Sequence, residues 1–205
     1  MKGFPLIVSY YTKDTLYQLE VQNLIASCEM WGLEHHVEAI DSLGSWERNC
    51  AYKPLFLYQK LEQFQRPLFW LDADAVFLQK PQLLDQFSSD IATRINASYE
   101  ANHPSRVITG SLYVNNTEPA KRVLKVWAKG CIESLTDPKR TDEMWDQVVL
   151  RDVFLRQDHG ARIEALPLGY AMIVGHPLDE EQAGERVIGH YQASRRFKKM
   201  INGVE

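Results

Sequence analysis

Apolar and polar positions along the first third of the chain follow the order strand, helix, strand, helix, strand. Short apolar runs at 4–10, 36–40 and 67–71 predict buried strands. Between them, apolar residues at helical spacing predict helices from about residue 12 to 30 and from 54 to 64. This order is typical of a parallel sheet with helices on its faces.

Shorter elements of the same kinds follow. Strands are predicted at 90–93, 111–114, 163–166 and 187–188, a short helical turn at 81–87, and helices capped by Thr117 and Thr141. The polar stretches 43–49 and 94–109 are predicted to be loops, the second of them mobile and lying over the site. Because neither a repeat nor a linker divides the sequence, residues 1–205 are expected to form one domain.

The third predicted strand ends in two carboxylates. Residues 67–71 lead directly into Asp72 and Asp74. Side chains two residues apart in an extended backbone point the same way, so both carboxylates can face one ligand. Two acids this close repel each other unless a cation lies near them. Oxygen ligands at this spacing suit Mg²⁺ or Mn²⁺, which often completes its coordination with substrate phosphates.

Polar residues also follow the other two strands of this first third. They are Tyr10, Tyr11 and Thr12 after the first strand and Asp41 after the second. Open parallel sheets bind ligands beyond the carboxyl ends of their strands. The sequence therefore predicts a binding site at this edge, built from three successive strand exits.

Composition and charge narrow the class of protein. A formal charge of −4 gives no basic surface for nucleic acid. Three scattered cysteines (Cys28, Cys50 and Cys131) show no metal-binding spacing and fit a reducing compartment. Apolar runs fall short of the roughly 18 residues that a membrane span needs, and the first run is too short for a signal peptide. A cytoplasmic, bacterial protein without a transmembrane segment is therefore expected.

Four stretches carry a resemblance to a known family. They are 6–11 with the helix after it, 44–54, 70–81, and 109–117 with Trp127 and then Asp146-Gln147 downstream. In this order and spacing they resemble the small nucleotide-sugar-dependent glycosyltransferases of the GT-A fold, the nucleotide-diphospho-sugar transferase type. The resemblance covers roughly residues 6–155. It implies a single α/β domain with a mostly parallel central sheet flanked by helices.

The resemblance implies a metal site and a donor site. Asp74 would bind the metal directly, Asp72 would reach the metal or the ribose, and His190 is the candidate for a late metal ligand. The donor site would contain residues at the base (Tyr10, Tyr11, Thr12 and Asp41), Lys53, and Gly110 and Ser111 beside the sugar. Asp146 and Gln147 would lie near the sugar and the acceptor, with Asp146 as base, nucleophile or acceptor anchor.

The basic C-terminal stretch has two further interpretations besides a solvated helix end. Its charged residues are Arg195, Arg196, Lys198 and Lys199. They could cover the donor diphosphate, or they could contact an anionic membrane that carries a lipid acceptor. The tryptophans Trp46, Trp127 and Trp145 are expected to pack in the core.

The function that the resemblance implies is transfer of a sugar from a nucleotide-diphosphate donor, with a UDP-sugar favoured. The acceptor would be a hydroxyl of a glycan, lipid or protein, a cell-envelope glycan among them, and Mn²⁺ or Mg²⁺ would be required. One alternative is a HAD-type phosphatase with Asp72 as the nucleophile, since an apolar strand followed by Asp-Ala-Asp also fits that class. A second alternative is a non-catalytic module that binds nucleotide sugars.

Overall fold

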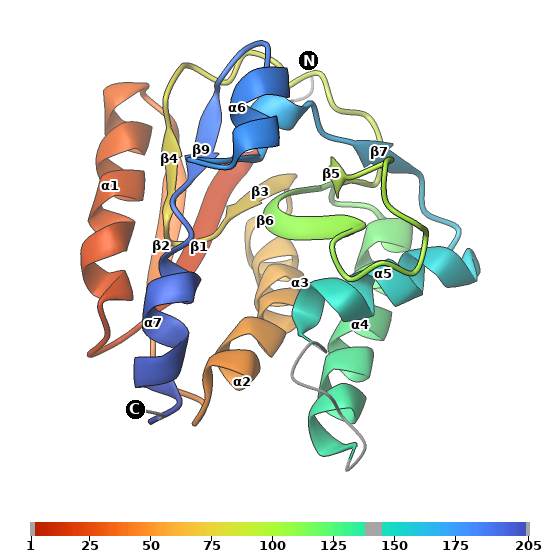
Figure 1. Ribbon diagram of the computed structural model, residues 1–205. Coiled ribbons are helices and arrows are strands. Elements are labelled where there is room, and N and C mark those ends of the chain that lie inside the picture. The colour runs from red at the N-terminus through yellow and green to blue at the C-terminus, as the bar shows by residue number, and fades with distance from the viewer. Residues whose placement is uncertain (1–2, 138–144, 204–205) are drawn as a thin grey trace.

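A six-stranded sheet forms the centre of the computed structural model, which describes residues 3–137 and 145–203 (Figure 1). Its strand order is β2-β1-β3-β6-β5-β7. The strands are β1 (Leu6–Thr12), β2 (His35–Ile40), β3 (Leu68–Leu71), β5 (Ile91–Ile95), β6 (Val107–Val114) and β7 (Ile163–Ala165). Strand β6 is antiparallel to its neighbours β3 and β5, and the other neighbouring pairs are parallel. The predicted mostly parallel α/β sheet is therefore confirmed.

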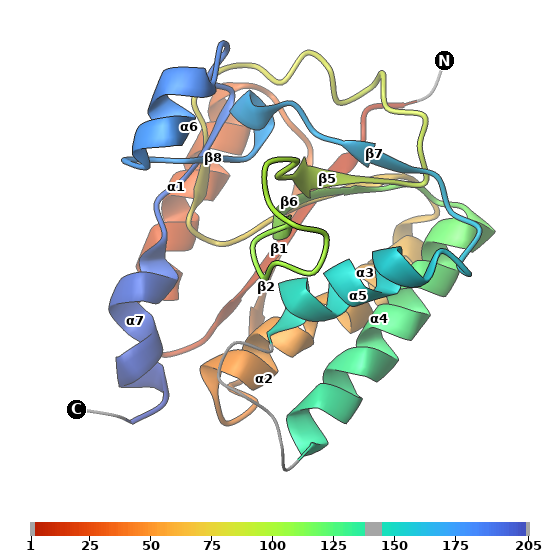
Figure 2. The same ribbon diagram turned by 45° about the vertical axis from the view of Figure 1, so that its right-hand side comes forward.

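Helices cover both faces of this sheet (Figures 1 and 2). They are α1 (Tyr17–Met30), α2 (Trp46–Ala51), α3 (Lys53–Phe64), α4 (Glu118–Thr136) and α5 (Asp146–Arg156). Strand β1 illustrates how the sequence produces the layers. Leu6 and Val8 point into the cluster formed with α3, α4 and α5, whereas Ile7 points into the cluster formed with α1. Alternate strand residues face opposite sides, so an unbroken apolar strand is buried by helices on both faces.

A second, smaller sheet joins the C-terminal part of the chain to the segment after β3. Its strands are β4 (Ala75–Phe77), β9 (Ile188–His190) and β8 (Met172–Ile173). Between and after them lie the 3₁₀ turn η1 (Leu168–Tyr170), α6 (Pro177–Gln182) and α7 (Ala193–Ile201). Strand β4 pairs antiparallel with β9, with Ala75 opposite His190. This pairing brings the end of the chain to the Asp-X-Asp segment.

The structure differs from the sequence-based expectation in several places. Residues 43–49 were predicted to be a loop, but α2 begins at Trp46, because the Ser45 side chain accepts a hydrogen bond from the Arg48 N–H (3.2 Å) and caps the helix. The predicted loop 94–109 is shortened at both ends by β5 and β6. Where a short helical turn was predicted at 81–87, residues 82–86 form hydrogen-bonded turns. The predicted cap Thr141 lies outside the described residues.

Thr117, by contrast, caps α4 as predicted, accepting a hydrogen bond from the Ala120 N–H (3.3 Å). In the described part of the chain, none of the helices combines the length and the apolar character that crossing a membrane requires.

Candidate active site

Asp72 and Asp74 lie at the carboxyl end of β3, in the tight turn that leads into β4. The turn is closed by a hydrogen bond from the Ala75 N–H to the Asp72 carbonyl (2.9 Å). Strand β3 lies between β1 and β6 in the sheet, and the Asp72 N–H donates to the Gly110 carbonyl of β6 (2.9 Å). The acid pair is thus at the centre of the sheet edge, as the strand pattern predicted.

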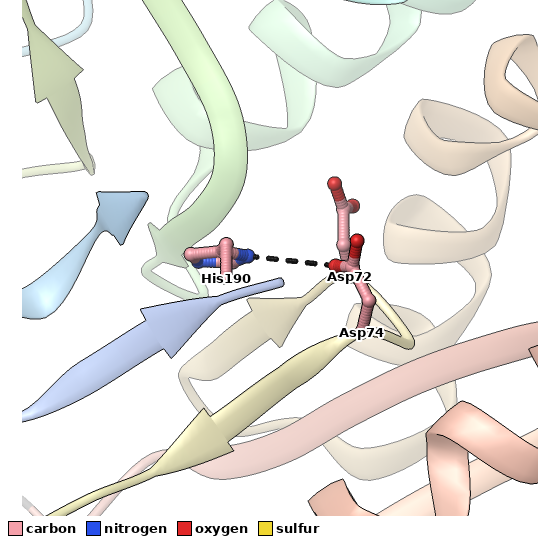
Figure 3. A group of neighbouring side chains, drawn as sticks. All are labelled: Asp72, Asp74 and His190. Carbon is pink, nitrogen blue, oxygen red and sulfur yellow. Dashed lines mark ion pairs between the residues drawn. The ribbon is translucent and has the colours of Figure 1, made fainter. Parts of the chain in front are cut away.

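Three side chains from two distant segments face one another at this point (Figure 3). Asp72, Asp74 and His190 each offer a ligand atom, and these atoms all lie within 4.8 Å of one another. The dashed line in Figure 3 marks the approach of His190 Nδ1 to Asp74 Oδ1, at 3.8 Å. His190 comes from β9, so the β4–β9 pairing assembles the group.

Second contacts fix the orientation of these ligands. The Asp74 Oδ2 accepts a hydrogen bond from the Ala193 N–H at the start of α7 (2.7 Å). Burial by itself would raise the pKa of the Asp74 carboxyl, but His190 and the Ala193 N–H stabilise its charged form and hold the pKa below its ordinary value. His190 Nε2 lies 2.8 Å from Ser111 Oγ, which leaves Nδ1 directed at the carboxylates.

Gly110 leaves the space that this group needs. A Cβ at position 110 would lie 3.0 Å from His190 Cε1, 3.2 Å from His190 Nδ1 and 3.4 Å from Asp72 Oδ2. Such a carbon would stand against both an imidazole ligand atom and a carboxylate ligand atom. The glycine therefore permits the close approach of β6 to the acid pair.

A second, buried charge network adjoins the acid pair. Lys53 Nζ lies 3.0 Å from Asp72 Oδ1 and 3.0 Å from Asp146 Oδ2. Thr109 Oγ1 also donates to Asp146 Oδ2 (2.9 Å), and the Trp127 indole N–H donates to the Asp146 carbonyl (2.7 Å). Burial would lower the pKa of Lys53, but Asp146 and Asp72 outweigh it, so that the pKa lies above its ordinary value and the amine is charged at neutral pH.

The charges of these groups fit a divalent cation. Asp72, Asp74 and Asp146 supply three carboxylates, and Lys53 is the cation that contacts two of them. The Asp74 carboxylate is paired with the imidazole of His190. Two carboxylates and one imidazole are donors that suit Mn²⁺, and oxygen donors suit Mg²⁺. The residues present are therefore chemically suited to hold such an ion.

A cleft of about 940 Å³ opens over this edge of the sheet. Most of the site residues predicted from the sequence line it, namely Tyr10, Tyr11, Thr12, Lys53, Asp72, Asp74, Gly110, Asp146, Gln147 and His190. They come from β1, α3, the β3–β4 turn, β6, α5 and β9. The fold thus gathers at one cleft residues that are far apart in the sequence.

Two predicted site residues are not among the described residues that line the cleft. Asp41 lies at the end of the edge strand β2, with 87% of its side chain exposed, and pairs with Lys13 (3.0 Å). Ser111 is fully buried behind His190. Tyr10 lines the cleft but is mainly a core residue, since its ring packs against Trp70 at 4.9 Å and its hydroxyl donates to the Asn49 carbonyl.

Two of the three tryptophans that were predicted to pack in the core line the cleft instead. Trp127 is fully buried, as predicted. Trp46 and Trp145 instead line the cleft, with their rings edge to face at 6.3 Å. Trp145 directly precedes Asp146, and that position beside a candidate site residue was the one sequence signal for its location. For Trp46 the signal was its place in the 44–54 stretch, which belongs to the family resemblance and also contains Lys53.

The basic C-terminal stretch forms α7, and two of its cations line the cleft, Arg195 and Lys198. Lys198 Nζ is 2.9 Å from Glu47 Oε1 and lies over the Trp46 ring at 4.7 Å. Asn202 accepts a hydrogen bond from the Trp46 N–H (2.8 Å). Helix α7 is therefore attached to α2 at the mouth of the cleft.

Three solved structures with a similar fold are described as glycosyltransferases. A glycosyltransferase involved in the glycosylation of the major capsid of PBCV-1 aligns with a TM-score of 0.69 and 19% identity, over 98% of this chain and 100% of its own. The galactosyltransferase LgtC, solved with donor and acceptor sugar analogs, aligns with a TM-score of 0.55 and 11% identity over 97% and 96%. GlyE of Streptococcus pneumoniae TIGR4 has a TM-score of 0.56 and 13% identity, over 93% of this chain and 55% of its own.

A search of the curated proteins gave no match. A family model, however, matches most of the chain, over residues 56–195, and describes nucleotide-diphospho-sugar transferases. The matched range includes both acids of the Asp-X-Asp pair, the start of α5 and the candidate metal ligand His190. This chain belongs to the nucleotide-diphospho-sugar transferase family and is a glycosyltransferase of the GT-A fold.

Proposed function

We propose that this protein transfers a hexose from a nucleotide-diphosphate donor, with a UDP-sugar favoured, to an acceptor hydroxyl, and that it requires Mn²⁺ or Mg²⁺. The observation that carries the proposal is the grouping of Asp72, Asp74 and His190 within 4.8 Å, beside the Lys53–Asp146 pair in one cleft. The structural neighbour LgtC, a galactosyltransferase, supports a hexose as the transferred group.

Asp72, Asp74 and His190 would hold the cation. When bound, it supplies positive charge to the diphosphate oxygen on which negative charge develops as the donor is cleaved. Arg195 and Lys198 line the same cleft and can add further positive charge on the phosphate side. For Lys198 this requires competition with its present partner Glu47.

Lys53 acts on the positions of the two acids. By contacting Asp72 and Asp146 at 3.0 Å each, it holds the metal-side and the sugar-side carboxylates at a fixed separation. Asp146 is 4% exposed and its Oδ2 is already bonded to Lys53 and Thr109. The carboxylate can still accept hydrogen bonds from hydroxyl groups of a sugar in the cleft. We therefore assign it to orienting the sugar that is transferred.

The sequence left two alternative functions, a phosphatase and a non-catalytic binding module. The fold argues against the first, and a turnover assay distinguishes the second. The phosphatase interpretation loses its support, because the family and the fold are those of sugar transferases. A non-catalytic binding module would have the same fold and is distinguished only by turnover. A cytoplasmic location, a bacterial origin and membrane contact through α7 stay predictions.

Donor turnover tests the proposal. The protein is incubated with UDP- and GDP-sugars with and without Mn²⁺, and release of free nucleotide diphosphate is followed. We expect slow, Mn²⁺-dependent hydrolysis of a UDP-sugar, and its loss together with metal-dependent donor binding in Asp74→Ala. Asp85→Ala, which removes an exposed acid outside the cleft, is the matched control. Donor affinity that is the same in Asp74→Ala and wild type with Mn²⁺ would refute the metal role.

A further inference from the structure

The loop at residues 96–106, between β5 and β6, forms one wall of the cleft. Its shape is fixed by its own hydrogen bonds. Arg106 donates to the carbonyls of Asn96 and Tyr99 (2.9 Å each), and the Asn96 amide donates to the Ser105 carbonyl (2.7 Å). These bonds tie the two ends of the loop together, and the mobility predicted from the sequence stays a prediction.

Two side chains of helix α5 also form hydrogen bonds with this loop. The Gln147 amide donates to the Pro104 carbonyl (3.0 Å), and the buried Arg151, one turn later, donates to the Asn102 carbonyl. Asp146, immediately before Gln147, faces the Lys53 network. One turn of α5 therefore fixes the position of the loop relative to the Asp146 carboxylate.

The loop presents an aromatic ring to the cleft. Tyr99 is 40% exposed and lines the cleft, and His103 stacks on it with ring centres 4.1 Å apart and planes 4° from parallel. His103 Nδ1 accepts a hydrogen bond from the Ser105 N–H (3.0 Å), which fixes the imidazole. A large, partly exposed ring thus packs against the fixed imidazole in a loop that contributes little to the core.

The sheet topology separates the loop at residues 96–106 from the end of the cleft at β1, where the base of the donor would bind. Strands β1, β3 and β5 run in the same direction, so their carboxyl ends lie along one edge. In the order β1-β3-β6-β5, three strand spacings separate the exit of β1 from that of β5, roughly 14 Å at about 4.8 Å each. Asp72 lies between them, after β3. A donor with its base at β1 and its sugar beside Gly110 would direct its reactive end toward the Tyr99 wall.

We infer that Tyr99 is the platform for the acceptor, and that the acceptor is a glycan whose terminal sugar ring stacks on the phenol. The inference rests on the proposed function and names the class of acceptor. One face of a pyranose carries several C–H groups, and the π face of an aromatic ring is negative and apolar, so the two attract each other and exclude water. Ser98 and Ser105 line the same wall and offer hydroxyl groups to the sugar.

This assignment gives Gln147 a positioning role. The Gln147 amide donates to the Pro104 carbonyl. Gln147 therefore acts on the acceptor by positioning the loop that carries Tyr99, not by direct contact. Its replacement by alanine should raise the acceptor KM more than it changes kcat. Glu at this position cannot donate the bond and should behave like alanine.

The binding test does not depend on turnover. Saturation-transfer NMR is recorded with methyl glycosides of glucose, galactose and N-acetylglucosamine at millimolar concentration. We expect a signal for at least one glycoside with the wild type and with Tyr99→Phe, and a loss of at least fivefold with Tyr99→Ala and Tyr99→Leu. Leucine keeps bulk but not the aromatic face. Tyr58→Ala, which removes a tyrosine on α3 outside the cleft, is the control and should keep the signal.

The kinetic test uses the same glycosides with a UDP-sugar and Mn²⁺. We expect the ratio of transfer to hydrolysis to fall at least tenfold in Tyr99→Ala and Tyr99→Leu and to be preserved in Tyr99→Phe. Equal glycoside signals in wild type and Tyr99→Ala, or a wild type that hydrolyses the donor but binds none of the glycosides, would overturn the inference. Failure of the proposed function is seen separately, as glycoside binding without release of UDP from any donor.

Discussion

Lys53 and Asp146 form an ion pair beneath the cleft, with 3.0 Å between Nζ and Oδ2 and with 5% of each side chain exposed. The pair joins the start of α3 to the start of α5. The Lys53 ammonium group also lies 3.0 Å from Oδ1 of a second acid, Asp72. One buried cation therefore ties together three segments of the candidate active site.

Removing this cation should destabilise the fold. Lys53→Met leaves Asp146 buried without a counter-charge, which should lower the free energy of unfolding by about 3–5 kcal/mol. The double variant Lys53→Met/Asp146→Leu removes the uncompensated charge and should recover part of that loss. Urea unfolding at pH 7 measures both, with the exposed Lys129→Met as control. A double variant less stable than Lys53→Met would contradict the pairing.

Ser111 should act on metal affinity through His190. Its hydroxyl lies 2.8 Å from His190 Nε2 and orients the ring. Loss of such a partner typically weakens metal binding 10- to 100-fold, so Ser111→Ala should lower Mn²⁺ affinity by about that factor. Electron paramagnetic resonance of free Mn²⁺ measures it. Ser89→Ala, which removes the hydroxyl of a buried serine outside the cleft, is the matched control, and equal Mn²⁺ affinity in both variants would argue against the orienting role.

The sequence predicted the parts of this site that depend on local pattern. An apolar strand ending in Asp72 and Asp74 is a short-range signal, because the acids follow the strand that positions them. Lys53 and Asp146 were also named, although only through the resemblance to a family. Their contact could not be predicted from the pattern, since it depends on how α3 and α5 pack against the sheet.

Long-range pairing and burial were harder to predict. His190 reaches the acids only through the pairing of β4 and β9, three-residue strands whose register no pattern fixes. Trp46 and Trp145 were assigned to the core because tryptophan is usually buried, yet they line the cleft. Asp41, which follows β2, was expected to be part of the donor site. Strand β2 is the edge strand, however, and 87% of the Asp41 side chain is exposed to solvent.

A methyl group at position 110 should disturb the metal ligands while the backbone tolerates it. The Cβ of Gly110→Ala would stand 3.0 Å from His190 Cε1, so the imidazole must move. We expect at least a tenfold loss of Mn²⁺ affinity and a loss of stability of about 1–3 kcal/mol. Gly184→Ala, where a Cβ meets nothing within 4 Å, is the control. Unchanged Mn²⁺ affinity in Gly110→Ala would show that the imidazole is not held at this distance.

The pair formed by Arg94 and Asp179 should make stability depend on pH. Asp179 is 1% exposed and its Oδ1 accepts from Arg94 Nη2 (2.8 Å), which joins β5 to α6 beside the cleft. Burial would raise the pKa of this carboxyl, but Arg94 and the Ile173 N–H outweigh it and lower the pKa below its ordinary value. His176, whose Nδ1 lies 3.3 Å from Oδ1, also contributes to lowering the pKa of the Asp179 carboxyl.

The sign of the effect follows from this direction. Because the folded pKa lies below the unfolded value of about 3.9, the stabilisation is complete above that pH and is lost as the pH falls through the folded pKa. Asp179→Asn should therefore be less stable than wild type by about 3 kcal/mol at pH 7. The difference should shrink below about pH 4, where this carboxyl takes up a proton in the unfolded chain before it does so in the folded protein. Urea unfolding at pH 7, 5 and 3 measures this difference, with the exposed Asp85→Asn as control. A difference in stability that stays constant down to pH 3 would show that the charge of Asp179 does not stabilise this contact.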